Sequence, residues 1–295
     1  MKVTVTGASG LIGTKLVGRL RARGDEVTTL SRSPSTPGAV GWQPEREPAP
    51  AAALGGRDAV VHLAGENVAQ RWSDDAKRRI RASRELGTRN LVAGIEAAAP
   101  RPQVLVCSSA IGYYGPHGDE RVDEDTPPGD DYLAQVCVAW EREAQRSAEL
   151  GLRVARIRTG VVLDKSGGAL AKMLPFFKLG VGGPVAGGRQ YMPWIHVDDV
   201  VGLYVAALDG AAWEGPINAS APEPVTNAAF SKALGRALHR PAFAPVPALA
   251  VRTLYGEMAE IVITGQRAVP RRAQELGYAF AHADLDEALR HALAS

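Results

Sequence analysis

The first 32 residues constrain the fold more than any other part of the chain, because they place a strand, a glycine turn and a helix in direct succession. Residues 3–6 form a short run typical of a buried strand, Gly7, Gly10 and Gly13 follow, and residues 11–23 repeat apolar side chains at helical spacing. Glycine allows a sharp turn and a close backbone approach to a phosphate, and the helix directs unpaired N–H groups and its positive dipole end at that anion. The pattern therefore predicts a phosphate-binding turn.

A second predicted strand, at residues 26–30, ends in Ser31 and Arg32. An acidic residue at this place would bind a ribose 2′-hydroxyl, whereas an arginine accommodates a 2′-phosphate. The hydroxyl of Ser31 can bind the same phosphate. These two residues therefore predict NADP, rather than NAD, as the cofactor.

Strand and helix patterns alternate through the first half of the chain. We predict further strands at residues 59–63, 103–109 and 153–162, and helices at residues 73–98 and 132–150. This alternation is typical of an α/β protein with a doubly wound parallel (Rossmann) sheet. Residues 34–56 are rich in proline, alanine and glycine, and we predict a loop there with at most a short helical turn.

The regular pattern ends after Leu163, where glycines become frequent and later segments are short and interrupted by proline. Helices are predicted at residues 227–238 and 284–293. We predict that residues 1–163 form an NADP-binding Rossmann domain to which residues 194–210 return. Residues 164–295 would mostly form a smaller substrate-binding lobe.

Composition narrows the possible partners. The 34 basic residues nearly balance the 32 acidic ones, so the net charge of +2 gives no reason to expect nucleic acid or a membrane surface as a partner. Cys107 and Cys137 lie in apolar surroundings without metal-ligand spacing, so we expect neither a metal site nor a disulfide framework. No targeting segment or membrane span is apparent. These features predict a cytoplasmic protein, and they leave oligomerisation possible.

Short blocks along almost the whole chain resemble a known family. The blocks Gly7–Gly13, His62–Gly65, Ser108–Ser109, Tyr114–Gly115 and Trp194–Asp199 are similar to the extended short-chain dehydrogenases/reductases. The blocks Ala64–Asn67, Arg71–Trp72, Ser83–Arg84, Ser109–Gly115, Trp140–Glu141, Arg158–Leu163 and Val269–Arg272 resemble an atypical branch, the "epimerase family" proteins of largely unknown substrate. The resemblance implies a dinucleotide cofactor and a small-molecule substrate, bound in a cleft between the Rossmann domain and the C-terminal lobe. It also implies an NADP(H)-binding oxidoreductase or an epimerase-like activity on nucleotide sugars.

Taken with this resemblance, the turn and the strand ends predict where the cofactor binds. The predicted contacts are Gly7, Ser9, Gly10, Leu11, Ile12, Gly13, Ser31, Arg32, Leu63, Ala64, Gly65, Arg84, Ser108 and Val162. Arg84 is included because it shares the apolar stripe of its helix with Ile80 and Leu91. A buried guanidinium needs an anion, which is either the cofactor or an internal carboxylate such as that of Glu66.

The expected catalytic residues depart from the family pattern. Relatives with redox chemistry use a Tyr-x-x-x-Lys pair, in which the ammonium lowers the pKa of the tyrosine. Here Tyr132 is followed by Val136, and a register shifted by one residue offers Leu133 with Cys137, so the usual lysine is absent. If the protein is an enzyme, we predict that Ser109 and Tyr132 polarise a substrate carbonyl. If it is not, it would be an NADP-sensing or assembly protein.

His196, Asp198 and Asp199 precede an apolar helical pattern that ends near Leu208. Short polar side chains at the start of a helix accept hydrogen bonds from its first N–H groups. We therefore interpret these residues as the beginning of a helix rather than as functional residues.

Overall fold

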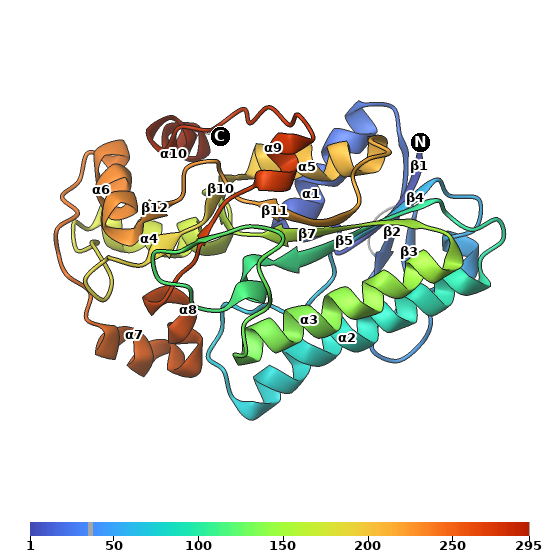
Figure 1. The fold of residues 1–295 in the computed structure, drawn as a ribbon, viewed down its shortest axis with the longest axis horizontal. Helices are drawn as coiled ribbons and strands as arrows, with labels where there is room; N and C mark the ends of the chain where they lie inside the picture. The colour runs from blue at the N-terminus through green and yellow to red at the C-terminus, as the bar shows by residue number, and fades with distance from the viewer. Residues whose placement is uncertain (35–37, 295) are drawn as a thin grey trace.

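The computed structural model describes residues 1–34 and 38–294, and a seven-stranded parallel sheet forms its centre (Figure 1). The strands are β1 (Lys2–Thr6), β2 (Glu26–Ser31), β3 (Ala39–Gly41), β4 (Ala59–His62), β5 (Val104–Ala110), β7 (Arg153–Thr159) and β11 (Gly215–Ala219). Their order is β11-β7-β5-β4-β1-β2-β3, and every neighbouring pair is parallel. The order reverses at β1, which confirms the predicted doubly wound sheet.

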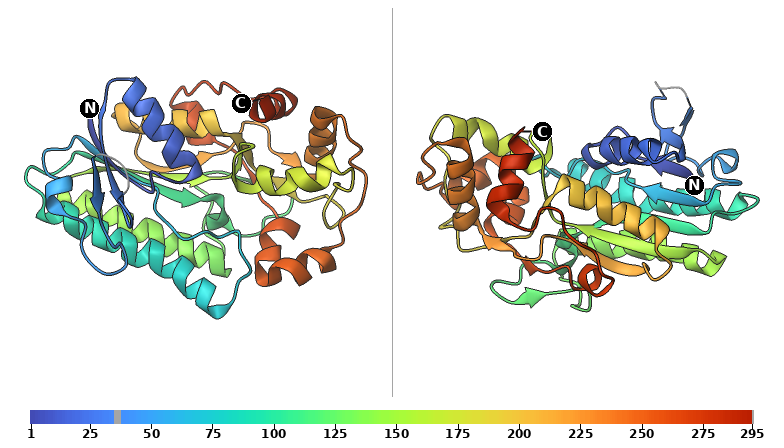
Figure 2. Two further views of the ribbon diagram at one scale, coloured as in Figure 1. Left: turned by 180° about the vertical axis from the view of Figure 1, so that it is seen from behind. Right: turned by 90° about the horizontal axis from the view of Figure 1, so that it is seen from above.

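Helices cover both faces of this sheet (Figures 1 and 2). Helices α2 (Asp74–Ala97) and α3 (Tyr132–Gln145) lie on one face, and α1 (Leu11–Ala22) and α5 (Val197–Asp209) lie on the other. Successive strand side chains point to opposite faces, so Val60 and Leu105 pack in one core while Val61 and Val106 pack in the other. Burial on both faces explains why these strands are continuously apolar.

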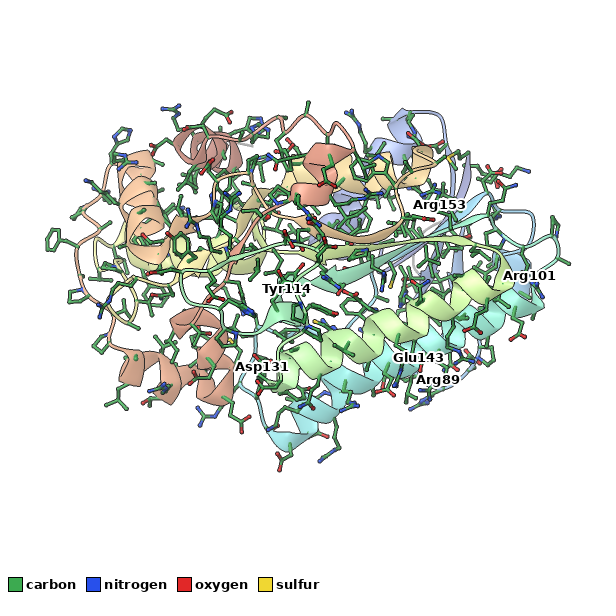
Figure 3. The ribbon with its side chains drawn as sticks, viewed as in Figure 1. Arg89, Arg101, Tyr114, Asp131, Glu143 and Arg153 are labelled. Atoms are coloured by element: carbon green, nitrogen blue, oxygen red, sulfur yellow. The ribbon has the colours of Figure 1, made fainter. Side chains whose placement is uncertain are left out.

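Helices α2 and α3 begin and pair where the sequence indicates. The Ser73 hydroxyl accepts a hydrogen bond from the first turn of α2, and the carboxylate of Asp131 does the same for α3, with Ala134 N at 2.8 Å. The guanidinium of Arg89 on α2 contacts the carboxylate of Glu143 on α3 at 2.8 Å (Figure 3). The two helices therefore form one layer.

The second half of the chain builds the smaller lobe and also returns to the sheet. Its core lies among α4 (Gly168–Lys178), α6 (Asn227–Leu238) and α10 (Leu285–Ala294). The remaining helices are α7 (Ala248–Tyr255), α8 (Ala259–Ile263) and α9 (Arg271–Glu275). Short strand pairs are β8 (Val161–Leu163) with β10 (Trp194–His196), β9 (Tyr191–Met192) with β12 (Val225–Thr226), and β6 (Arg121–Val122) with β13 (Arg267–Ala268). Short 3-10 turns occur at Ala51–Ala53, Ile111–Tyr114, Arg146–Leu150 and Gly256–Met258.

Several elements differ from the sequence predictions. The strand predicted at 153–162 divides at Gly160, where a Cβ atom would lie 2.1 Å from the carbonyl oxygen of Pro193. The predicted loop at 34–56 contains β3 and one 3-10 turn, and its residues 35–37 lie outside the described part. Strand β11 was not predicted, and it joins the sheet beside β7. Among the described residues, no helix has the length and apolarity that crossing a bilayer requires.

Candidate functional site

The turn between β1 and α1 requires its glycines for steric reasons. Gly7 has a φ of +68°, and a Cβ atom there would lie 2.6 Å from the carbonyl carbon of Leu63. A Cβ atom on Gly13 would lie 2.2 Å from the carbonyl oxygen of Gly7. The N–H of Gly10 donates to that same oxygen at 3.0 Å and closes the turn. The turn is therefore packed tightly on one side against the end of β4.

The backbone at the first turn of α1 lies on the side of the glycine turn that faces away from β4. Ser9 and Gly10 are exposed, and among the described residues no side chain caps this helix start and no acidic residue lies in its first turn. The N–H groups of Leu11, Ile12 and Gly13 lack intrahelical acceptors because they begin the helix. This end of α1 is suited to bind an anion.

Ser31 and Arg32 emerge at the same sheet edge as the glycine turn. Strands β1 and β2 are parallel and in register from Lys2 opposite Glu26 to Thr6 opposite Leu30. The segments that follow the two strands therefore leave the sheet side by side. Arg32 is exposed, and its carbonyl oxygen accepts a hydrogen bond from Gln43. The structure thus brings the predicted phosphate-binding turn close to Ser31 and Arg32, the two residues that predicted NADP.

Leu63 and Ala64 directly follow β4 and lie against the glycine turn. Their N–H groups both donate to the hydroxyl oxygen of Thr6 at 3.2 Å. That hydroxyl lies 2.7 Å from Nδ1 of the fully buried His62, whose Nε2 lies 3.1 Å from the hydroxyl of Thr88. The network assigns the ring proton to Nε2 of His62. Burial, aided by the charge of Arg84, lowers the pKa of His62 to about 4.

The guanidinium of Arg84 lies against Gly65. A Cβ atom on Gly65 would be 3.3 Å from the guanidinium of Arg84, which also packs on the ring of Trp140 at 5.0 Å. Nη1 donates to the carbonyl oxygens of Glu66 (3.0 Å) and Ile80 (3.2 Å). Arg84 therefore contacts the backbone of Glu66, whereas the carboxylate of Glu66 lies 3.7 Å from Nε of Arg79. Among the described residues, Arg84 forms hydrogen bonds through Nη1 alone.

Tyr132 begins α3 and lies against the start of α2. Its hydroxyl donates to the carbonyl oxygen of Lys77 at 2.6 Å, and its ring meets the edge of Trp72. Burial raises the pKa of Tyr132, and the charge of Arg84 opposes that shift. Val136, one helical turn further, is buried. The hydroxyl of Tyr132 can act on a substrate only after it leaves Lys77.

Ser109 lies near the end of β5 and is buried in the core. It is 2% exposed, and its hydroxyl donates to Oε1 of Glu141 at 2.7 Å. Glu141 also pairs with Arg158 at 2.8 and 3.0 Å. Arg158 in turn donates to the hydroxyl of Tyr114 (labelled in Figure 3), and this hydroxyl donates to Oδ1 of Asn218. In this arrangement Ser109 supports a buried ion pair, and its predicted role at a substrate carbonyl stays a prediction.

Sequence reasoning did not identify the pair of Glu141 and Arg158. The available signal was charge at positions where burial is expected, because Arg158 lies in a central strand and Glu141 follows Trp140 on an apolar helix. Neither residue is near the other in sequence, so the pairing itself was not visible.

Val162 and Ser108 complete the set of predicted cofactor contacts. Both are half-buried, on β8 and β5 respectively. A Cβ atom on Gly168 would lie 3.4 Å from the side chain of Leu11 and 3.6 Å from the carbonyl oxygen of Val162. The beginning of the C-terminal lobe therefore packs against the first turn of α1.

A glycine turn at a helix start, on the strand where a parallel sheet reverses its order, defines a Rossmann-type protein of the dinucleotide-binding class. The chain belongs to the NAD dependent epimerase/dehydratase family, which matches residues 3–218. Residues 246–292 match a domain of unknown function. The resemblance found in the sequence is thus confirmed.

Relatives cover the whole chain. An epimerase family protein of Arabidopsis thaliana, the chloroplastic SDR39U1 homolog, is 44% identical over 98% of this chain and 86% of its own length. The crystal structure of the human epimerase family protein SDR39U1 with NADPH has a TM-score of 0.93 at 36% identity, and each chain is covered completely. A nucleoside-diphosphate sugar epimerase from Corynebacterium glutamicum has a TM-score of 0.81 at 36% identity, covering 99% of this chain and 58% of that one.

Proposed function

We propose that this protein binds NADP(H) and catalyses hydride transfer on a small-molecule substrate, as an oxidoreductase or as an epimerase-like enzyme acting on a nucleotide sugar. The observation that carries the proposal is the placement of exposed Arg32 beside the glycine turn at one sheet edge. The human relative crystallised with NADPH supports the same cofactor.

The residues present fit such a cofactor. The glycine turn and the N–H groups of residues 11–13 would hold the diphosphate, and Ser31 and Arg32 would hold the 2′-phosphate. Leu63, Ala64 and Gly65, which follow β4, would contact the cofactor beyond the turn, and Val162 and Ser108 would contact it further along. When bound, NADP(H) supplies or accepts the hydride, and the protein supplies position and proton transfer.

Arg84 is our candidate for the positive charge that lysine provides in relatives. Burial lowers the pKa of Arg84, while its charge interactions with Cys137, Tyr132 and Glu66 raise it. A cation near a phenol favours the phenolate, so Arg84 would assist Tyr132 in releasing a proton. Ser109 would contribute only if its hydroxyl leaves Glu141.

The cofactor assignment is tested by Arg32→Glu. We expect NADPH affinity to fall about 10- to 100-fold, the equivalent of losing a charge-assisted hydrogen bond, while NADH affinity changes little. Calorimetry with both nucleotides measures this, and Arg21→Glu on the exposed side of α1 is the matched control. Equal weakening of NADPH and NADH would contradict a 2′-phosphate contact at Arg32.

The chemistry is tested with carbonyl compounds and nucleotide sugars, followed by NADPH absorbance. We expect saturable turnover that Tyr132→Phe abolishes. Arg84→Met should reduce the maximal rate more than Arg84→Lys does, because lysine keeps the charge. Turnover that both Tyr132→Phe and Ser109→Ala leave unchanged would show that other groups carry the proton.

A second function has one observation in its favour. The hydroxyls of Ser109 and Tyr132 are both engaged inside the protein, which suits an NADP-sensing or assembly protein without turnover. Such a protein would show no activity on any substrate and would recruit a partner only in the presence of NADPH. Pull-down experiments with and without NADPH separate this function from the enzyme.

We also propose that the protein is cytoplasmic. Cys107 and Cys137 are buried free thiols, which suits a reducing compartment.

A further inference from the structure

Three histidines and a carboxylate meet where the C-terminal helix approaches α5. His196 ends β10, Asp198 lies in the first turn of α5, His282 lies between α9 and α10, and His291 lies on α10. One potential ligand atom from each residue lies within 4.8 Å of the others. Figure 1 shows α10 on the same side of the molecule as α5. The cluster joins segments that are far apart in the sequence.

The carboxylate of Asp198 lies within contact range of every ring. Its Oδ2 is 3.6 Å from Nε2 of His282, 3.9 Å from Nδ1 of His291 and 3.7 Å from Nδ1 of His196. Two ligands of a tetrahedral zinc ion, each bound at about 2.0–2.2 Å, lie about 3.4 Å apart. The distances from Asp198 to His282 and to His291 exceed that spacing by only a few tenths of an ångström.

Glu287 fixes the tautomer of His282. Both oxygens of its carboxylate lie 3.0–3.1 Å from Nδ1 of His282, which places the ring proton there. The lone pair of Nε2 then faces Asp198. A carboxylate that holds the far nitrogen of a histidine is the usual outer contact of a metal ligand.

His196 contacts both Asp198 and His291. Its Nδ1 accepts the N–H of Asp198 at 3.1 Å, so its proton lies on Nε2. Nε2 of His196 is 3.1 Å from Nδ1 of His291, and it therefore donates to that nitrogen. The lone pair of Nδ1 of His291 therefore accepts this N–H when no ion is bound. His196 is fully buried and acts as a positioning residue.

Asp199 holds the backbone that carries His282. Its buried carboxylate accepts the N–H groups of Ala281 at 2.8 Å and His282 at 3.0 Å, and the hydroxyl of Tyr278 lies 3.3 Å from it. Because Asp199 is adjacent to Asp198, one helical turn fixes both the carboxylate and the opposing ring. Asp198 and His282 are therefore held in place before any ion arrives, and His291 is the ligand that must turn.

We propose that Asp198, His282 and His291 bind a divalent transition-metal ion, Zn²⁺ in particular, with water completing the coordination and Glu287 and His196 as positioning residues. Binding turns the lone pair of His291 from the N–H of His196 to the ion. Imidazole ligands select zinc over Mg²⁺ and Ca²⁺, which prefer oxygen. The carboxylates of Asp198 and Glu287 balance the charge of the ion. The ion ties α10 to the start of α5, and thereby links the C-terminal lobe to the sheet domain.

The test uses the full chain without a histidine tag, treated with EDTA and desalted. In calorimetry we expect Zn²⁺ to bind with a stoichiometry of one and Mg²⁺ not to bind. Asp198→Asn and His291→Ala should each weaken Zn²⁺ binding at least about 10-fold. Both side chains are about half exposed, at 51% and 45%, so these variants should fold like the wild type. Co²⁺ should give the visible absorption of a tetrahedral nitrogen and oxygen site.

Matched variants separate a built site from general histidine binding. His117→Ala removes a histidine outside the cluster and should bind Zn²⁺ like the wild type. Glu287→Gln should weaken Zn²⁺ about 10-fold and shift the Co²⁺ spectrum, which a merely structural residue would not do. Zn²⁺ should raise the melting temperature of the wild type but not that of Asp198→Asn. Absence of saturable Zn²⁺ binding, or unchanged binding in folded Asp198→Asn and His291→Ala, would overturn the proposal.

Discussion

At the scale of single residues, burial decides which groups carry charge. His62 is surrounded by the sheet and α2, and its two ring nitrogens contact Thr6 and Thr88. The same degree of burial is tolerated by Glu141 only because Arg158 neutralises it. His62 avoids the cost of burying a charge by staying neutral, whereas Glu141 offsets that cost by pairing with Arg158.

The low pKa of His62 makes stability depend on pH. The unfolded chain takes up a proton near pH 6.5, whereas folded His62 does so only near pH 4. The unfolded state therefore binds more protons between these values, and stability falls as the pH falls through that window. From pH 7 to 4.5 we expect a loss of about 2 kcal/mol from this residue.

Urea unfolding at the two pH values measures that loss. His62→Gln cannot titrate, so its free energy of unfolding should fall by about 2 kcal/mol less than that of the wild type. Because each protein is compared with itself at the two pH values, the change in the free energy of unfolding that the substitution itself causes cancels. Equal losses in both proteins would show that His62 does not stay neutral when folded.

At the scale of elements, α1 shows that two glycines of one helix have different roles. Gly13 faces the turn, where the carbonyl of Gly7 leaves no room for a side chain. Gly18 lies further along the helix on its exposed face, where an added methyl group would meet no atom within 4 Å. Only the first glycine is required by the site.

Alanine at these two positions should therefore have opposite effects. We expect Gly13→Ala to destabilise the protein by about 1–3 kcal/mol and to weaken NADPH binding, because the clash is with backbone. Gly18→Ala should stabilise it by about 0.5–1 kcal/mol through helix propensity, with unchanged NADPH affinity. Thermal unfolding and calorimetry measure both. A Gly13→Ala protein with wild-type stability and affinity would refute the close packing of the turn.

At the scale of the whole molecule, the sheet is not complete within the first half of the chain. Strand β11 covers the edge of β7, and α5 covers one sheet face with Val200, Leu203 and Tyr204, which are fully buried. The family match likewise extends to residue 218, at the end of β11. Residues 1–163 therefore share a core with α5, which the prediction returns to the first domain, and with β11, which the prediction does not include.

Two truncated chains test this. A fragment of residues 1–163 would expose the edge of β7 and the apolar face under α5, so we expect it to aggregate or to unfold without a cooperative transition. A fragment of residues 1–222 keeps α5 and β11 and should unfold cooperatively. Circular dichroism during urea titration distinguishes the two. Cooperative unfolding of the shorter fragment would show that residues 1–163 are sufficient.

The sequence by itself determined the local parts of this protein. The glycine turn, α1, α2 and the position of Arg32 after β2 could be predicted because their residues are close in the chain and follow a period of 2 or 3.6. Only the tertiary structure decided that β11 joins β7, that Ser109 meets Glu141 32 residues away, and that His291 meets His196 95 residues away. Such contacts depend on how layers pack, and no local period encodes which distant residues come to face each other.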